Sequence, residues 1–133
     1  MNFVKFGYVS SVNDSAGSVR VTFPDLDDQV SDELPLLSPQ AGWSAGVSLP
    51  APGEMVVCIF PEKGAEGVCL GTFSTMDRPP PGNADQRGTW FDDGSYVYYD
   101  RSSGVLAVKA VGRVRIEGDL EVTGTLTRGG DRL

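Results

Sequence analysis

A strict alternation near the end of the chain constrains the fold more than any other feature. From position 106 to 126 every even residue is apolar or glycine, and positions 113, 115, 117, 119 and 121 are charged. Side chains alternate between two faces along a strand, whereas they repeat every 3.6 residues along a helix. The segment is therefore predicted to be extended, with one apolar and one polar side, and a helix is excluded.

Glycine recurs every six residues in the same segment. Three or four rungs of six residues suit a narrow β-prism or β-helix, in which the chain bends sharply and glycine avoids a Cβ clash. So few rungs of one chain bury too little apolar surface, because each repeat needs a neighbour to cover it. Three identical chains around a common axis would place the even positions inside. The predicted repeat corners, called the corner glycines below, are Gly112, Gly118, Gly124 and Gly130.

The apolar residues at the even positions, called the even row below, form the predicted trimer core: Leu106, Val108, Val114, Ile116, Leu120, Val122 and Leu126. The charged residues at odd positions would lie outside, where Arg113 and Arg115 can pair with Glu117, Asp119 and Glu121. The alternative is a β-meander with its polar side outward, packed back on the rest of the chain. That alternative leaves the glycine spacing unexplained.

The first half of the chain is predicted to form two hairpins. Residues 6–12 and 18–23 flank a turn-forming run, and residues 55–60 and 67–73 flank a second turn at 61–66. Between them lies a long loop, 24–51, which is rich in acids and prolines and holds a short apolar piece at 34–37. Short strands with one long connection fit an all-β, OB-type Greek-key barrel. A fragment of a β-sandwich is the alternative.

The composition changes along the chain and predicts two parts. Residues 1–74 form the expected barrel domain, and residues 75–88, which include Arg78-Pro-Pro-Pro-Gly82, are expected to form a stiff linker. Residues 89–133 form the expected spike segment. Its first strands carry aromatic residues around an Asp93-Gly94 hairpin signal, and a further turn is expected at 101–104.

The two cysteines are predicted to be cross-strand neighbours. Pairing of the second hairpin about the middle of its turn sets Cys58 opposite Cys69. Two states are open: reduced thiols in the core, or a disulfide formed after release from the cell, since cytoplasmic thiols are kept reduced. Without histidine or a second cysteine pair, the two thiols cannot complete a tetrahedral zinc site.

Composition excludes several classes of function. The chain has no histidine, which removes the usual general base near neutral pH, and its net charge of −7 opposes binding to nucleic acid. The loop acids lack the spacing of a calcium site, so we expect them to be solvated: Asp25, Asp27, Asp28, Asp32 and Glu33. No catalytic residue, cofactor or metal is expected. For Trp43, Trp90 and Phe91 we expect core or interface packing, because base stacking would need a basic groove.

Four segments together resemble a known family. They are GYVSSVNDSAGSVRVTFP at 7–24, LPAPGEMVVCIF at 49–60, GVCLGTF at 67–73 and IEGDLEVTG at 116–124. In this order and spacing they resemble baseplate assembly protein V, the central spike of contractile-tailed phages, which is similar to the valine-glycine-repeat spikes of type VI secretion. The resemblance implies an OB-fold collar and an intertwined trimeric β-helix that breaches the host envelope when the sheath contracts.

The resemblance also implies partners. They are two further copies of the chain, baseplate hub and tail tube proteins, and the host outer membrane in a transient contact. The family's His-x-His metal apex is missing, because the chain has no histidine. Either a separate tip protein caps the trimer, or the spike is short and blunt. The protein is expected in the virion after synthesis in the host cytoplasm, since residues 1–7 lack a signal-peptide pattern.

Two other functions are weighed against the spike. An OB-type module that binds an oligosaccharide or oligonucleotide predicts a monomer with ligand affinity. A hydrolase domain has no recognisable catalytic set in this sequence.

Overall fold

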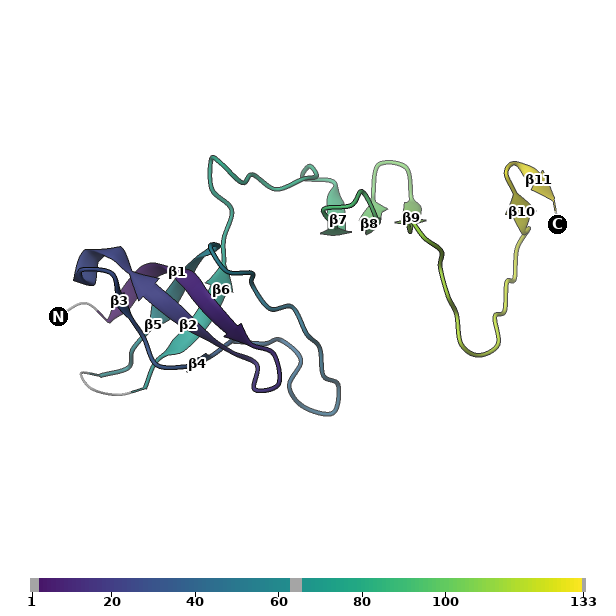
Figure 1. The fold of residues 1–133 in the computed structure, drawn as a ribbon. Coiled ribbons are helices and arrows are strands. Elements are labelled where there is room, and N and C mark those ends of the chain that lie inside the picture. The colour runs from purple at the N-terminus through teal and green to yellow at the C-terminus, as the bar shows by residue number, and fades with distance from the viewer. Residues whose placement is uncertain (1–2, 63–65, 133) are drawn as a thin grey trace. The chain divides into compact units, whose positions relative to one another are not determined.

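A computed structural model describes residues 3–62 and 66–132. The chain divides into two compact units, residues 1–79 and 80–133, and each is described by itself. The described residues are all-β: their only helical element is a single 3-10 turn, η1 (Pro24–Leu26) (Figure 1). None of their helical structure is long and apolar enough to cross a membrane.

The first unit contains one antiparallel sheet. Its strands are β1 (Val4–Asn13), β2 (Ser18–Phe23), β3 (Gln29–Val30), β4 (Leu34–Pro35), β5 (Met55–Ile59) and β6 (Val68–Thr72). They lie in the order β3-β2-β1-β5-β6, and β4 pairs with β2 as well. Both predicted hairpins are confirmed, as β1–β2 and β5–β6. The loop expected over 24–51 is interrupted by η1, β3 and β4, which the sequence pattern did not resolve.

The hydrogen-bonded sheet closes on itself through the residues that follow β4. Leu36 forms a parallel bridge with Cys69 of β6, and the Leu37 N–H donates to the Cys69 carbonyl at 2.8 Å. Because β4 already pairs with β2, the sequence β2-β1-β5-β6 returns to β2 through this short segment. The unit therefore has an inside, and the alternating strands fill it.

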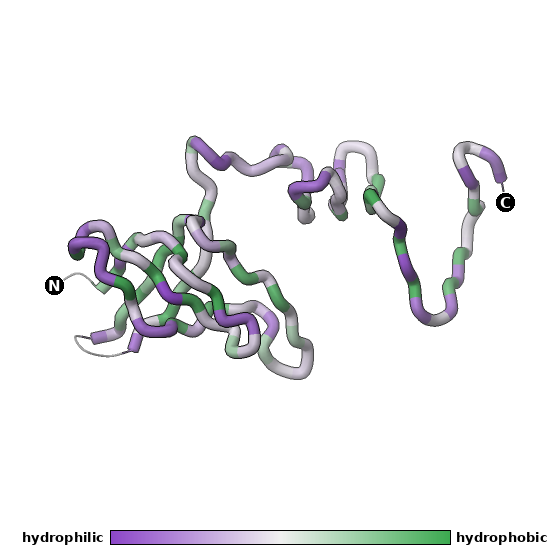
Figure 2. The backbone as a smooth tube through the Cα atoms, viewed as in Figure 1, coloured by the Kyte–Doolittle hydropathy of each residue, from purple (hydrophilic) through white to green (hydrophobic). Residues whose placement is uncertain are grey.

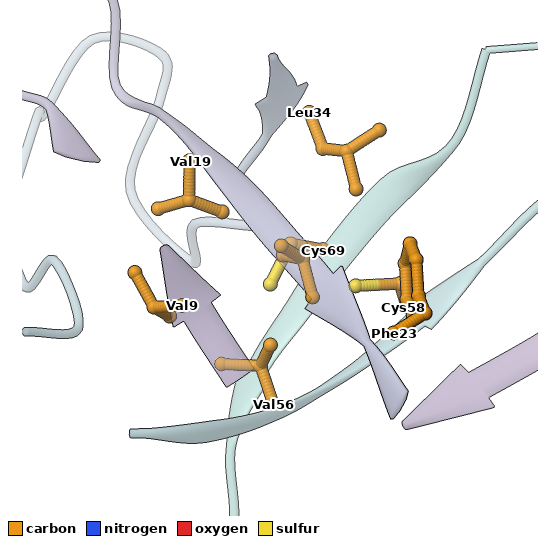
Figure 3. Close-up of a cluster of buried hydrophobic side chains, with 8 residues drawn as sticks. Val9, Val19, Phe23, Leu34, Val56, Cys58 and Cys69 are labelled. Carbon is orange, nitrogen blue, oxygen red and sulfur yellow. The ribbon is translucent and has the colours of Figure 1, made fainter. Parts of the chain in front are cut away.

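The core is built from the inward-facing residues of these strands (Figure 3). On β2 and β5 burial alternates with sequence position, as expected when one face of each strand is covered. The buried hydrophobic residues that form this core are Val9, Val19, Val21, Phe23, Leu34, Val56, Cys58 and Cys69. A core of small β-branched side chains and two thiols is compact, and Phe23 extends it to Phe60 through an edge-on ring contact at 6.0 Å.

The predicted pairing of the cysteines is confirmed. Cys58 on β5 lies directly opposite Cys69 on β6, and both are free thiols with no solvent exposure. A hydrogen bond with Cys69, together with burial, raises the pKa of the Cys58 thiol above its ordinary value. Residues 63–65 of the predicted turn lie outside the described residues.

The second unit begins with a three-stranded antiparallel sheet in the order β7-β8-β9. Its strands are β7 (Gln86–Trp90), β8 (Tyr96–Asp100) and β9 (Val105–Lys109), and a short hairpin follows from β10 (Thr127–Arg128) and β11 (Asp131–Arg132). The hairpin predicted at Asp93-Gly94 is confirmed: Gly94 has a φ of 93°, and the Ser95 N–H donates to Asp93 Oδ1 at 2.8 Å. The turn at 101–104 is also present.

The expected linker is too long at its C-terminal end. The last three residues assigned to it, 86–88, belong to β7 and pair with β8, with Gln86 opposite Asp100 and Gly88 opposite Tyr98. A Cβ on Gly88 would lie 2.1 Å from the Val97 carbonyl oxygen, so glycine allows the close approach of the two strands. The low apolar content of residues 86–88 suggested a linker, but their backbone pairs with the aromatic strand β8 and they form part of β7.

Candidate assembly interface

Only the first residues of the alternating segment, 106–109, form a strand within the single chain, as part of β9. β9 ends at Lys109 and β10 begins at Thr127, so the strands predicted between them are wrong for the isolated chain (Figure 1). The meander alternative fails for the same reason. A strand needs a hydrogen-bonded neighbour, and residues 112–126 form no backbone hydrogen bond with any residue that the structure describes. Their N–H and C=O groups are free to pair with another chain.

The even row lies exposed along this segment. Its seven side chains retain between 45% (Val122) and 66% (Leu120) of their accessible surface. In Figure 2 the tube after β9 changes repeatedly between the hydrophobic and the hydrophilic colour, as expected for the alternating sequence. Isolated exposed apolar residues are ordinary, but a regular row of seven is typical of a surface that another molecule covers.

The backbone bends at the corner glycines. Bends fall at residues 111–112, 118 and 123–124, and a turn follows at 129–130, so the direction changes about every six residues. Gly118 and Gly130 have φ values of 128° and 92°, which side-chain-bearing residues rarely adopt. At Gly112 and Gly124 the φ lies outside this region and a Cβ would meet nothing within 4 Å. The isolated chain therefore requires glycine at two of the four corners.

Polar contacts at the odd positions are few and exposed. Arg115 Nη2 and Glu117 Oε1 are 3.0 Å apart, and both side chains are largely in solvent. Such a pair contributes little to stability. It shows that positions 115 and 117 share one side of the segment, opposite Ile116. Where the segment begins, the Val111 N–H donates to Ser95 Oγ at 3.0 Å and attaches it to the β7–β8 turn.

The three aromatic residues expected to pack have different surroundings. Trp90 on β7 stacks on Tyr98 of β8, with ring centroids 4.9 Å apart. Phe91 is about half exposed, and Trp43 is fully exposed on its loop. Packing of Trp43 in the core of its own chain is therefore wrong. The small residues that flank it, from Ala41 to Gly46, were the one signal in the sequence for an outward-facing tip.

The acidic loop does not gather its carboxylates. Glu33 accepts a hydrogen bond from Asn13 Nδ2 at 2.7 Å, and Asp27 and Asp28 have φ values of 55° and 57° in the turn after η1. Among the described residues there is no group of three or more acids or thiols positioned to hold a metal ion.

One hollow in the first unit bears on ligand binding. It has a volume of about 300 Å³ and combines an apolar wall, including Phe23, Leu34 and Phe60, with acidic side chains such as Glu62. Lys5 is the one cation among its described lining residues. An acidic lining with one lysine opposes the phosphates of an oligonucleotide.

Comparison with protein-family models and with curated proteins finds no match.

Proposed function

We propose that the protein is a structural component of a contractile tail baseplate in a phage virion: the homotrimeric central spike, which acts without catalysis. One observation carries the proposal. The even row is exposed in the isolated chain, and five of its seven residues, from Val114 to Leu126, lie on residues 112–126, which have no backbone partner among the described residues and bend about every six residues. Such a segment has both the apolar surface and the free hydrogen-bonding groups that intertwined strands need.

Three chains satisfy both requirements together. With the segments wound around one axis, the even row of each chain faces inward and the charged odd positions face solvent. The free N–H and C=O groups of each segment pair with those of the neighbouring chains, so no edge remains open. The corner glycines then mark the corners of a β-prism or β-helix.

The first unit would serve as the collar. Its closed ring of short strands is compatible with an OB-type barrel. In the proposed assembly this barrel would contact baseplate hub and tail tube proteins. The far end of the spike would contact the host outer membrane transiently during sheath contraction. It would be capped by a separate tip protein or would end bluntly, since the chain has no histidine for a metal-bound apex.

Stiffness is the working property in this proposal. An axial push from the contracting tail passes from the collar to the spike, and interwound strands resist sliding because each chain is held by the other two. Chains in such a structure must largely unfold before they part, so the trimer should persist under load.

The mass of the purified full-length chain in solution tests the proposal. A spike requires a trimer of three 14.2 kDa chains, about 43 kDa by light scattering. The second candidate, an OB-type module for an oligosaccharide, is favoured by the 300 Å³ hollow. It predicts a 14.2 kDa monomer that binds oligosaccharide in a titration. A monomeric mass would refute the spike.

A further inference from the structure

Trp43 is held outward at the tip of an ordered loop. Its side chain is fully exposed, so it contacts nothing in its own chain. Below it the loop is closed by a bridge between Ala41 and Ala45 and by the Gly46 N–H, which donates to the Gln40 carbonyl at 3.1 Å. An indole that is presented on a braced tip and has no intramolecular partner is placed to bind another molecule.

The loop around Trp43 carries no charge. Residues 34–53 contain no Asp, Glu, Lys or Arg, although the whole chain has a net charge of −7. Copies of such a chain repel one another, so they associate most easily through uncharged surfaces. We call residues 38–50 the tryptophan arm.

The first unit also has an apolar patch on the outside of its sheet. On β1 and β5 the inward residues fill the core, and the residues between them face outward. Phe6 lies opposite Val57, Tyr8 lies opposite Met55, and Phe73 contacts Phe6 edge-on at 5.6 Å. These five residues form the outer patch, in which Phe6 is 56% exposed.

We infer that the tryptophan arm of one copy docks on the outer patch of the neighbouring copy within the trimer. The inference rests on the proposed trimer and specifies how its collars are joined. The arm and the outer patch are different surfaces, so the contact is heterologous, and three such contacts close a ring. The arm lacks charge, which suits self-association of an acidic chain, and the hollow beside Phe6, Tyr8 and Met55 is lined by one base and one acid, Lys5 and Asp25.

The area available favours a copy of the same trimer as the occupant. A buried tryptophan contributes roughly 200 Å², and with its counterpart surface one contact would cover well below the roughly 1,200 Å² of a stable independent interface. A partner in free solution would therefore bind weakly. A neighbour tethered by the spike segment is present at an effective concentration of roughly millimolar, which lets a small contact form.

Fluorescence of Trp43 in the full-length chain tests the inference. Trp90→Phe leaves Trp43 as the sole tryptophan, and acrylamide quenching reports its accessibility. We expect quenching in the trimer about threefold weaker than in the chain dissociated by Ile116→Asp, because docking excludes water from the indole. Adding Phe6→Ser should restore strong quenching while the mass stays that of a trimer. The matched control is Val30→Ser, at a similarly exposed residue outside the outer patch.

The outcomes separate the two proposals. A trimer in which Trp43 is quenched as strongly as in the dissociated chain would overturn the docking and leave the spike intact. The docking would also be wrong if Trp43 in the trimer became shielded only on addition of phospholipid vesicles, since the arm would then contact a membrane. A monomeric full-length chain would overturn both proposals.

Discussion

Replacing Ile116 by aspartate should dissociate the trimer. Ile116 lies in the middle of the even row, and 58% of its surface is exposed in the isolated chain. In the proposed assembly each of the three chains buries this surface of its own Ile116 at the common axis. Ile116→Asp removes the apolar contact from every chain and places three carboxylates close together in a dry core.

The expected loss of association free energy is large, both from the missing apolar contact and from the buried carboxylates. Burying the remaining ~100 Å² of the isoleucine side chain is worth about 2.5 kcal/mol per chain, or about 7 kcal/mol per trimer. Each carboxylate adds a desolvation cost of several kcal/mol unless it is protonated. The apolar loss by itself lowers the association constant by about five orders of magnitude. At micromolar concentration the variant should therefore be monomeric.

Light scattering on the full-length variant at neutral pH measures the result. We expect 14.2 kDa in place of about 43 kDa. Thr123→Asp is the matched control, because it adds the same charge at an odd position beside the row and should leave the trimer intact. Acidification toward pH 4 protonates the introduced carboxyls and should restore part of the trimer. An unchanged trimeric mass for Ile116→Asp at neutral pH would refute the placement of the even row at the axis.

Three further predictions concern the assembly and its units. Labelled and unlabelled trimers, once mixed, should exchange no subunits over hours with or without chelator, because the chains part only by unfolding. Energy transfer between the dyes measures the exchange, and exchange within minutes would contradict interlocked chains. Gly7→Ala should lower the free energy of unfolding by about 2 kcal/mol in urea titrations. The added Cβ would lie 2.5 Å from Val21 Cγ1 and 2.6 Å from the Thr22 carbonyl oxygen. An unchanged urea midpoint would show that the strands relax to accept the methyl group. The Ser102 hydroxyl and the Gln86 amide donate to Asp100 and lower its pKa in the fold. Asp100 therefore stabilises the fold above its ordinary pKa, and this stabilisation is lost as the pH falls through the lowered value; Asp100→Asn should flatten the acid limb of thermal melts, and identical melting profiles from pH 2 to 7 would contradict this role.

Local patterns in the sequence are sufficient for the hairpins. Turn residues such as Asp93-Gly94 and alternation along the flanking strands determine which segments pair, because the relevant contacts are near in sequence. The exact register was not predicted, since β1–β2 and β5–β6 contain register shifts and the β7–β8 loop has five residues, 91–95. The opposition of Cys58 and Cys69 follows from pairing about one short turn. The all-β class follows from the same features.

Contacts between distant segments were not marked in the sequence by any pattern comparable to the turn residues and alternation of the hairpins. The bridge from Leu36 to Cys69 closes the sheet, yet it involves a single residue pair far apart in the chain, and no periodic pattern marks it. The pairing of Gln86–Gly88 with β8 was hidden because those residues are polar, and backbone hydrogen bonding is independent of side-chain hydropathy. The full exposure of Trp43 likewise depends on how its loop closes.

The spike segment shows most clearly which features local sequence patterns determine and which depend on contacts with other segments. Alternation determines which side chains share a side, since successive side chains of an extended chain point in opposite directions whatever surrounds them. The glycine spacing accounts for where the backbone bends. Whether residues 112–126 become strands depends on hydrogen-bonding partners, and those are supplied by neighbouring segments in space. The structure of one chain leaves these backbone groups free and the even row exposed, because a ladder and a core both require a second surface.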